Sequence, residues 1–193
     1  MASMRMPMLS PRVRDAGENE IVLSPGANVD LDVSASDLES FDVVLAQLEA
    51  PPAAVAEASL RSRRLVLNVA PISPIATEVL ERCAVIVANE LEAESLDLAR
   101  LRHVIVTLGA RGATHLRFGR EVASRAAPRV AVLDTVGAGD VFCAAYALQF
   151  AKGADADDAL NYAVVAGALA TRASGAQGSL PTDQEVRAWL ARG

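Results

Sequence analysis

The chain is poor in aromatic residues and in cysteine. Only 4% of its 193 residues are aromatic, so a hydrophobic core has to be built mainly from alanine, valine and leucine, which suits close packing of helices on a sheet. Its two cysteines, Cys83 and Cys143, lie in separate apolar segments and have no CxxC or Cys/His spacing. This excludes a cysteine-based metal site and predicts reduced core thiols in a cytoplasmic protein.

Long apolar runs and clustered basic residues are also missing. The longest apolar run, residues 163–170, is far shorter than the roughly 20 residues that cross a bilayer. The first residues lack the uninterrupted apolar stretch of a secretory signal. A formal net charge of −6 argues against general binding to nucleic acid or to a membrane surface. We therefore expect no membrane and no nucleic-acid partner.

The composition that remains, 52% hydrophobic and 22% charged, is typical of one globular domain. Short apolar runs alternate with helical patterns from residue 43 onward, which indicates an α/β fold with a mostly parallel central sheet. A turn glycine between two β-prone arms predicts a hairpin over residues 112–125. Strands are predicted at 41–48, 64–70, 84–89, 103–109 and 130–133, and helices at 51–62, 73–83, 90–101, 140–152, 155–172 and from 182 to the C-terminus.

Two capping boxes are expected to begin helices. Thr182 precedes Glu185 by three residues, and Ser36 precedes Glu39 by the same spacing, so each pair predicts a helix start. The first forty residues otherwise alternate weakly. Residues 20–24 are predicted to be a strand for which the nearby sequence offers no partner.

The segment Asp134–Asp140, with the sequence DTVGAGD, joins an apolar run to a long helical pattern. Unpaired N–H groups and a partial positive charge at a helix N-terminus favour anions, and glycines let an anion approach the backbone. A P-loop needs a lysine after its last glycine, and none follows Gly139. A dinucleotide loop needs a third small residue where Phe142 stands, and the carboxylate of Asp140 would repel a pyrophosphate.

A third interpretation gives the aspartate a role. The amides of Gly137, Ala138 and Gly139 would stabilise charge on a phosphoryl group in transfer, while Asp140 would remove the proton from the attacking hydroxyl. The plain alternative is that Asp140 only caps the helix, which is the commoner role of an isolated aspartate near a helix start.

The same residues match a signature of the ribokinase-like (PfkB-type) carbohydrate kinases, and the chain resembles that family, closest to its ribokinase branch, over most of its length. Further segments resemble the family in the family's order. These are GENEIVLSPGAN at 17–28, VLAQLEAP at 44–51, LNVAP at 67–71, VANELEAESL at 87–96, VIVTLGARG at 104–112 and GAQGSLP at 175–181.

The resemblance implies a three-layer αβα, Rossmann-like fold and a set of site residues. Asp140 would be the general base and residues 137–139 the anion hole, with Glu49 near the sugar. ATP, Mg²⁺ and K⁺ would be the cofactors. The nucleotide would be bound by Asn89, Thr107, Gly109, Arg111, Gly112 and Val164; Glu92 would help to position Mg²⁺; and a monovalent cation would lie at Asp134, the carbonyl of Val136, Ala170, Ala173, Gly175 and Ser179.

Each of these residues has an ordinary structural alternative. Asn89 could end a strand and cap the next helix, and Glu92 in the first turn of that helix could be a partner of the helix dipole. Glu49 could be a solvated strand end. His103 and His115 are expected to be surface or strand residues, because neither belongs to a motif.

The resemblance has a limit at the N-terminus. Family members place a further section, with the first sheet strands and most of a lid, before the segment that matches residues 17–28. We expect one partial domain, with residues 1–28 as a lid remnant and lead-in and residues 29–193 as the α/β core. The implied function is ATP-dependent phosphorylation of a primary hydroxyl of ribose or a related sugar, of doubtful activity in this shortened chain. The alternative is a non-catalytic nucleotide-binding or interaction module, and a homodimer is a further candidate assembly.

Overall fold

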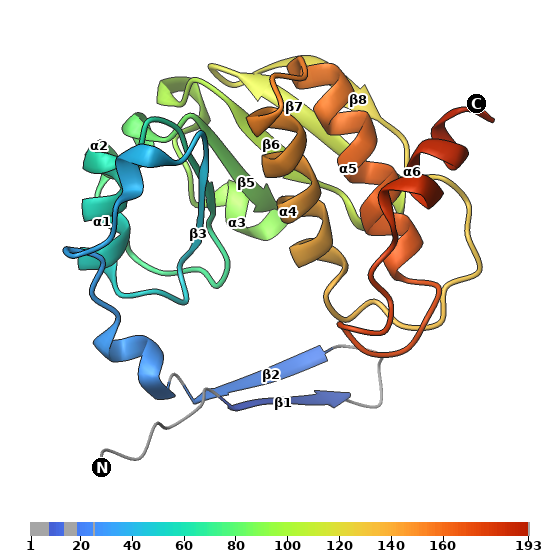
Figure 1. Cartoon of the computed structure of the whole chain (residues 1–193), viewed down its shortest axis with the longest axis horizontal. Helices are drawn as coiled ribbons and strands as arrows, with labels where there is room; N and C mark the ends of the chain where they lie inside the picture. The colour runs from blue at the N-terminus through green and yellow to red at the C-terminus, as the bar shows by residue number, and fades with distance from the viewer. Residues whose placement is uncertain (1–7, 14–18, 25, 193) are drawn as a thin grey trace.

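The fold is an α/β core with a separate two-stranded hairpin (Figure 1), and the computed structural model describes residues 8–13, 19–24 and 26–192. The strands are β1 (Met8–Val13), β2 (Asn19–Ser24), β3 (Val44–Gln47), β4 (Leu65–Asn68), β5 (Val85–Asn89), β6 (Val104–Thr107), β7 (Ala113–Arg117) and β8 (Arg120–Arg125). The helices are α1 (Pro52–Arg61), α2 (Thr77–Arg82), α3 (Glu90–Glu94), α4 (Ala138–Ala151), α5 (Ala156–Ala170) and α6 (Asp183–Leu190).

The six strands of the core follow one another in chain order, from β3 to β8. β3, β4, β5 and β6 are parallel, whereas β7 and β8 return antiparallel to them. The predicted hairpin at 112–125 is therefore confirmed as β7 and β8. Parallel strands need helical crossovers, and α1, α2 and α3 supply them here.

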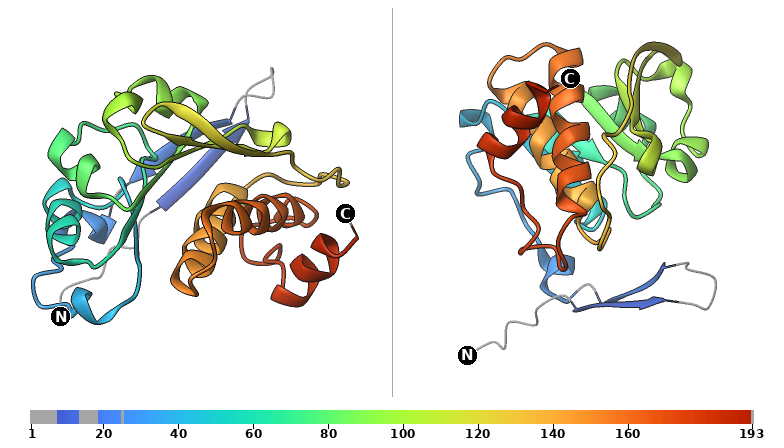
Figure 2. Two further views of the ribbon diagram at one scale, coloured as in Figure 1. Left: turned by 90° about the horizontal axis from the view of Figure 1, so that it is seen from above. Right: turned by 90° about the vertical axis from the view of Figure 1, so that its right-hand side faces the viewer.

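Helices cover both faces of the sheet, which confirms the predicted three-layer αβα arrangement (Figure 2). On one face α1 and α2 pack against alternate residues of the central strands, such as Leu67 and Ile86. On the other face α4 and α5 pack against the intervening residues, such as Val66 and Ile105. Most of the core side chains are Ala, Val, Leu and Ile, as the low aromatic content predicts, and α6 packs on α5 through Val186.

Both cysteines are buried in these two packing layers. Burial raises the pKa of the Cys83 thiol to about 12, and burial, followed by the negative charges of Asp140 and Glu92, raises that of Cys143 to about 12. A thiol in this state is a poor nucleophile and a poor metal ligand. The predicted place of both cysteines in the core, as free thiols, is confirmed.

The capping box at the C-terminal helix is confirmed, because Thr182 Oγ1 accepts from the N–H of Glu185, whose carboxylate accepts from the N–H of Thr182. The box predicted at Ser36 and Glu39 is wrong. Only a short 3-10 turn forms there, without a side-chain cap, since Glu39 instead approaches the guanidinium of Arg61 at 3.7 Å.

Two expectations about strands are also wrong. Residues 130–133 form no strand in the described sheets, because the N–H groups of Leu133 and Asp134 donate to the carbonyl of Thr171 at the end of α5. Residues 20–24 do have a partner, since β2 pairs antiparallel with β1 along its whole length. The predicted lid remnant thus contains a hairpin, although residues 1–7, 14–18 and 25 of it lie outside the described residues.

Several predicted elements are shorter than their patterns. The strand at 41–48 is confined to β3, the helix at 73–83 to α2, and the helix at 90–101 to α3 followed by a 3-10 turn at Leu98–Arg100. No helix within the described ranges combines the length and the apolar character that a membrane span would require.

Candidate functional site

The predicted phosphate-binding turn lies at the N-terminus of α4, at the end of the sheet where the parallel strands finish. Gly137 is the N-cap and has a left-handed backbone (φ 79°, ψ −3°). A Cβ on this glycine would lie 2.9 Å from the Cβ of Ala176, so both the backbone and the neighbouring loop require glycine here. Gly139 lies in the first turn of α4, and a Cβ there would meet nothing within 4 Å.

Asp140 follows in the same helical turn and is exposed to solvent. One of its carboxylate oxygens, Oδ1, accepts a hydrogen bond of 2.8 Å from Nε2 of Gln47, the last residue of β3. The carboxylate therefore faces the carboxyl end of an edge strand of the described sheet. It is neither packed in the interior nor used to cap its own helix through a backbone N–H.

A cavity of about 670 Å³ opens on one side of this helix start. Thr107 and Gly112 supply its wall at the end of β6, Gly139 lies at the N-terminus of α4, and Val164 faces it from α5. Its lining is mostly apolar and small. The complete lining is Thr107, Gly109, Ala110, Gly112, Ala127, Pro128, Arg129, Val130, Val132, Thr135, Ala138, Gly139, Phe142, Val164, Gly167, Ala168 and Thr171.

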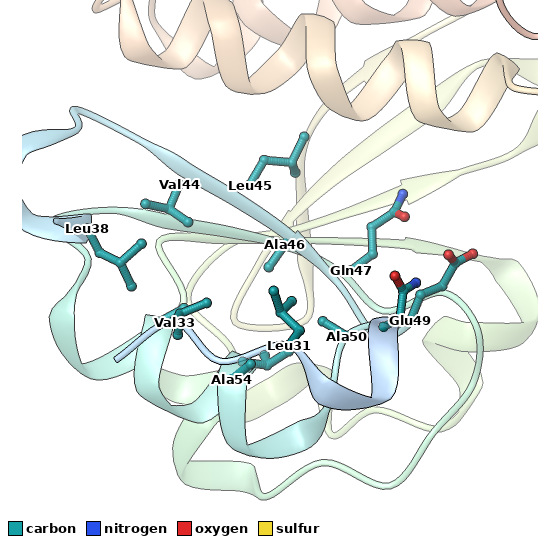
Figure 3. A pocket seen from close by; sticks show the side chains of 13 residues that line it. Leu31, Val33, Leu38, Val44, Leu45, Ala46, Gln47, Glu49, Ala50 and Ala54 are labelled. Carbon is teal, nitrogen blue, oxygen red and sulfur yellow. The ribbon is translucent and has the colours of Figure 1, made fainter. Parts of the chain in front are cut away.

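A second cavity of about 400 Å³ lies beside β3, between this strand, α1 and the segment before β3 (Figure 3). Aliphatic side chains make most of its wall, with Leu31 and Val33 on the side of the preceding segment. Gln47 and Glu49 lie at its polar end, and Asn28 also belongs to its lining. Gln47 lines this cavity and also contacts Asp140, whose neighbour Gly139 lines the large cavity, so the start of α4 is linked to the linings of both.

The loop before α4 is fastened to the loop after α5 through Asp134. Its Oδ2 accepts from the N–H of Gly175 at 2.9 Å, and its Oδ1 accepts from the N–H of Val136 at 2.9 Å. These bonds, that from Gly175 first, hold the pKa of Asp134 below its ordinary value. The structure thus brings Asp134, Val136 and Gly175 together, with Ala173 and Ser179 on the same loop and Ala170 at the end of α5.

Asn89 and Glu92 form a capping box at the start of α3. Asn89 Oδ1 accepts from the N–H of Glu92 at 2.8 Å, and Glu92 Oε2 accepts from the N–H of Asn89 at 2.7 Å. The side chain of Glu92 is buried, and neither residue lines the large cavity. The ordinary alternative for this pair is therefore realised in the fold, while its predicted part in binding nucleotide and Mg²⁺ stays a prediction.

The other predicted nucleotide residues divide into two groups. Thr107, Gly109, Gly112 and Val164 all line the large cavity. Arg111 is exposed and pairs with Glu90 instead, and hydrogen bonding to that carboxylate raises the pKa of the Arg111 guanidinium.

Within the described ranges, no cluster of three or more His, Cys, Asp or Glu side chains is placed to hold a metal ion. Mg²⁺ in phosphate-transfer sites keeps waters and takes substrate phosphates with one or two carboxylates, so such a cluster is not required. Asp134 carries a negative charge between the two loops, and its predicted part in binding a monovalent cation stays a prediction.

Two side-chain contacts, one in the site and one away from it, were not expected from the sequence. Gln47 was not predicted to contact Asp140, because a contact across 93 positions leaves no periodic signal; its place two residues before Glu49, which lies in the turn after β3, is the nearest hint. His103 and His115 also form a pair, with Nδ1 and Nε2 2.9 Å apart, and His115 is buried in β7. Burial lowers the pKa of both imidazoles.

Comparison with known proteins places these features in one family. The family described as pfkB family carbohydrate kinase matches residues 12–183. A relative, the ribokinase of Bacillus subtilis, is 33% identical over 193 aligned positions, which cover 90% of this chain. Among solved structures, a ribokinase from Thermotoga maritima has a TM-score of 0.87 at 27% identity, with 98% of this chain and 71% of that chain covered.

A ribokinase of Arabidopsis thaliana, solved with ribose and ATP, is also similar, with a TM-score of 0.80 at 26% identity. The match covers 93% of this chain and 67% of that chain. The chain spans 65% of the length of the Bacillus subtilis relative.

Proposed function

Because the chain belongs to the pfkB family of carbohydrate kinases, we propose that it carries the nucleotide and catalytic parts of an ATP-dependent sugar kinase. The reaction would transfer the γ-phosphate of ATP to a primary hydroxyl of ribose or a related sugar. The named relatives are ribokinases, and the Arabidopsis thaliana structure holds ribose and ATP, which supports this substrate class.

The turn that starts α4 is linked to the linings of both cavities, and this supports the proposal. Gly139 lines the large cavity, and Asp140 accepts a hydrogen bond from Gln47, which lines the small cavity together with Glu49. A nucleotide in the first and an acceptor at the polar end of the second would meet beside Asp140. The carboxylate is exposed at that junction, as a base must be to reach an external hydroxyl.

The residues of the turn would have separate roles. Asp140 would take the proton of the attacking hydroxyl, and the N–H groups of residues 137–139 would stabilise the negative charge on the phosphoryl group as it moves. Gly139 leaves open space for that approach, whereas Gly137 gives the turn its left-handed shape. Glu49, exposed at the same end of the small cavity, would accept a hydrogen bond from a sugar hydroxyl.

The cofactors follow from the same arrangement. Mg²⁺ would accompany the ATP phosphates and supply positive charge to the transferred group, with Glu92 as the predicted protein contribution. A potassium ion would be held by the carboxylate of Asp134 and backbone oxygens. Its positive charge would stabilise the conformation of the loop that precedes α4. That loop is already joined to Gly175 through Asp134.

Phosphorylation of D-ribose by ATP, in the presence of Mg²⁺ and K⁺, tests the proposal. We expect turnover by the wild-type chain and a loss of about 10²-fold or more in Asp140→Asn, the usual contribution of a general base. Asp158→Asn, an exposed aspartate in the first turn of α5, is the matched control and should retain activity. Absence of turnover in the wild-type chain would contradict the proposal.

A second candidate function is favoured by the exposed edge of the sheet. β3 ends the described sheet on one side, and Leu45 on this strand is 38% exposed. A non-catalytic nucleotide-binding module would present such an edge to another chain, because unpaired strands bind partners readily. ATP binding without turnover, with an affinity that D-ribose does not change, would favour this candidate over the kinase.

A further inference from the structure

Gln47 donates a hydrogen bond to Asp140, and the roles proposed for the residues of the site do not include it. It ends β3, where its Cα is paired with that of Asn68 on β4. Its carbonyl accepts from the N–H of Ala50 at 3.2 Å in the turn that leads to α1. The backbone of Gln47 is therefore fixed on both sides, and its side chain projects from β3 toward α4 (Figure 3).

The carboxylate of Asp140 has a single protein donor among the described residues. Gln47 Nε2 donates to Oδ1 at 2.8 Å, a normal length for such a bond, and no described donor reaches Oδ2. One oxygen is thereby fixed, and the other is free to face an acceptor. Without such a contact, an exposed carboxylate on the first turn of a helix can exchange between staggered rotamers, which would place the base variably.

The chemical type of the donor also suits a base. A lysine or arginine at position 47 would form an ion pair with Asp140 and favour its charged form, which opposes proton uptake. The side-chain amide of glutamine is neutral, so it orients the carboxylate and leaves its negative charge available.

We propose that Gln47 is a positioning residue that holds the carboxylate of Asp140 toward the acceptor hydroxyl. The inference rests on the proposed kinase function and deepens it. Gln47 does not exchange a proton and touches no phosphate; it acts through Asp140. It also lines the small cavity together with Glu49, so the orientation of the base is set by the same strand end that would meet the sugar.

Two substitutions at one position test this role. Gln47→Met keeps the length of the side chain and removes the donor, and Gln47→Glu keeps the shape and sets a second carboxylate against Asp140. We expect Gln47→Met to lower kcat about tenfold, as loss of an orienting contact does, with KM for ATP unchanged, and Gln47→Glu to lower it further. Gln184→Met makes the same chemical change on the exposed surface of α6 and should retain wild-type kcat.

Coupling to Asp140 separates a positioning role from a structural one. In an Asp140→Asn background, Gln47→Met should lower kcat no further, because the base it orients is already gone. Equal losses in both backgrounds would overturn the inference, as would a wild-type kcat in Gln47→Met. A wild-type chain that phosphorylates no sugar would instead contradict the proposed function.

A measurement without turnover tests the contact itself. The side-chain amide signals of Gln47 in a ¹H–¹⁵N spectrum, assigned by their loss in Gln47→Met, should shift in Asp140→Ala and stay in place in Asp158→Ala. Signals that do not respond to Asp140→Ala would overturn the inference even in a chain that is active.

Discussion

The two glycines that flank Ala138 are expected to respond in opposite ways to the same change, since only one of them is required by the fold. In Gly137→Ala the new residue has to adopt a left-handed backbone, which costs about 1–2 kcal/mol. Its Cβ would also lie 2.9 Å from that of Ala176, closer than the ~3.5–4.0 Å of a normal carbon contact. Reduced freedom of the unfolded chain offsets about 0.4–1 kcal/mol. We expect a net loss of about 1–2 kcal/mol in the free energy of unfolding.

Gly139→Ala should have the opposite effect on stability. Gly139 has a helical backbone in the first turn of α4, and its Cβ would meet nothing within 4 Å. Replacing a helical glycine by alanine stabilises a helix by about 0.5–1 kcal/mol. The added methyl group would, however, stand at the large cavity, where the proposed phosphate must approach the backbone closely. We expect ATP affinity to fall about tenfold, equivalent to ~1.4 kcal/mol.

Urea denaturation and titration calorimetry with ATP measure the two effects separately. Gly153→Ala is the control, because Gly153 also has a positive φ of 82° but follows α4 at its far end, away from the cavity. It should lose stability and keep ATP affinity. The account is refuted if Gly137→Ala and Gly139→Ala change stability in the same direction, or if Gly139→Ala binds ATP like the wild type.

Three further predictions concern the rest of the fold. The pKa values of His103 and His115 are lowered in the folded chain, so the unfolded chain binds more protons and the free energy of unfolding should fall as pH drops below about 6.5. His115→Gln should flatten this pH dependence, which urea titrations at pH 5–8 would measure. Gly112→Ala should cost more than ~4 kcal/mol, since its Cβ would lie 1.9 Å from the carbonyl oxygen of Arg125; a soluble variant with a wild-type melting temperature would contradict this. Thr182→Ala should cost about 1 kcal/mol by removing the cap of α6, which thermal unfolding of this variant beside Thr182→Ser would test.

Much of the architecture could be predicted because its signals are local. The apolar runs at β4, β5 and β6 are continuous since both faces of these strands are buried, and Thr182 with Glu185 marks a helix start within four residues. Ser36 and Glu39 have the same spacing and form no cap. The difference comes from a tertiary contact, because Arg61 from α1 lies close to Glu39 and donates to the carbonyl of Ser36. The spacing of Ser36 and Glu39 does not reveal that contact.

Some residues of the candidate site could likewise be predicted from local sequence, and others could not. The turn at 137–140 is visible in the sequence because glycine and aspartate have special local properties there. The role of Gln47 is not visible, because it arises from a contact between β3 and α4, 93 positions apart in the chain. The strand predicted at 130–133 is absent because a tertiary contact again decides the local structure. Its apolar residues resemble a strand, yet Val132 and Leu133 are exposed beside the end of α5.

If Asp140 removes the proton of a sugar hydroxyl as it attacks the γ-phosphorus of ATP, the transferred phosphate must appear on the sugar. ³¹P NMR of the chain with ATP, Mg²⁺, K⁺ and D-ribose shows where the phosphate goes. We expect a sugar phosphomonoester signal with the wild type and with Asp158→Asn, and none with Asp140→Asn over the same period. A phosphomonoester that forms equally fast with Asp140→Asn, or release of inorganic phosphate alone by the wild type, would show that Asp140 is not this base.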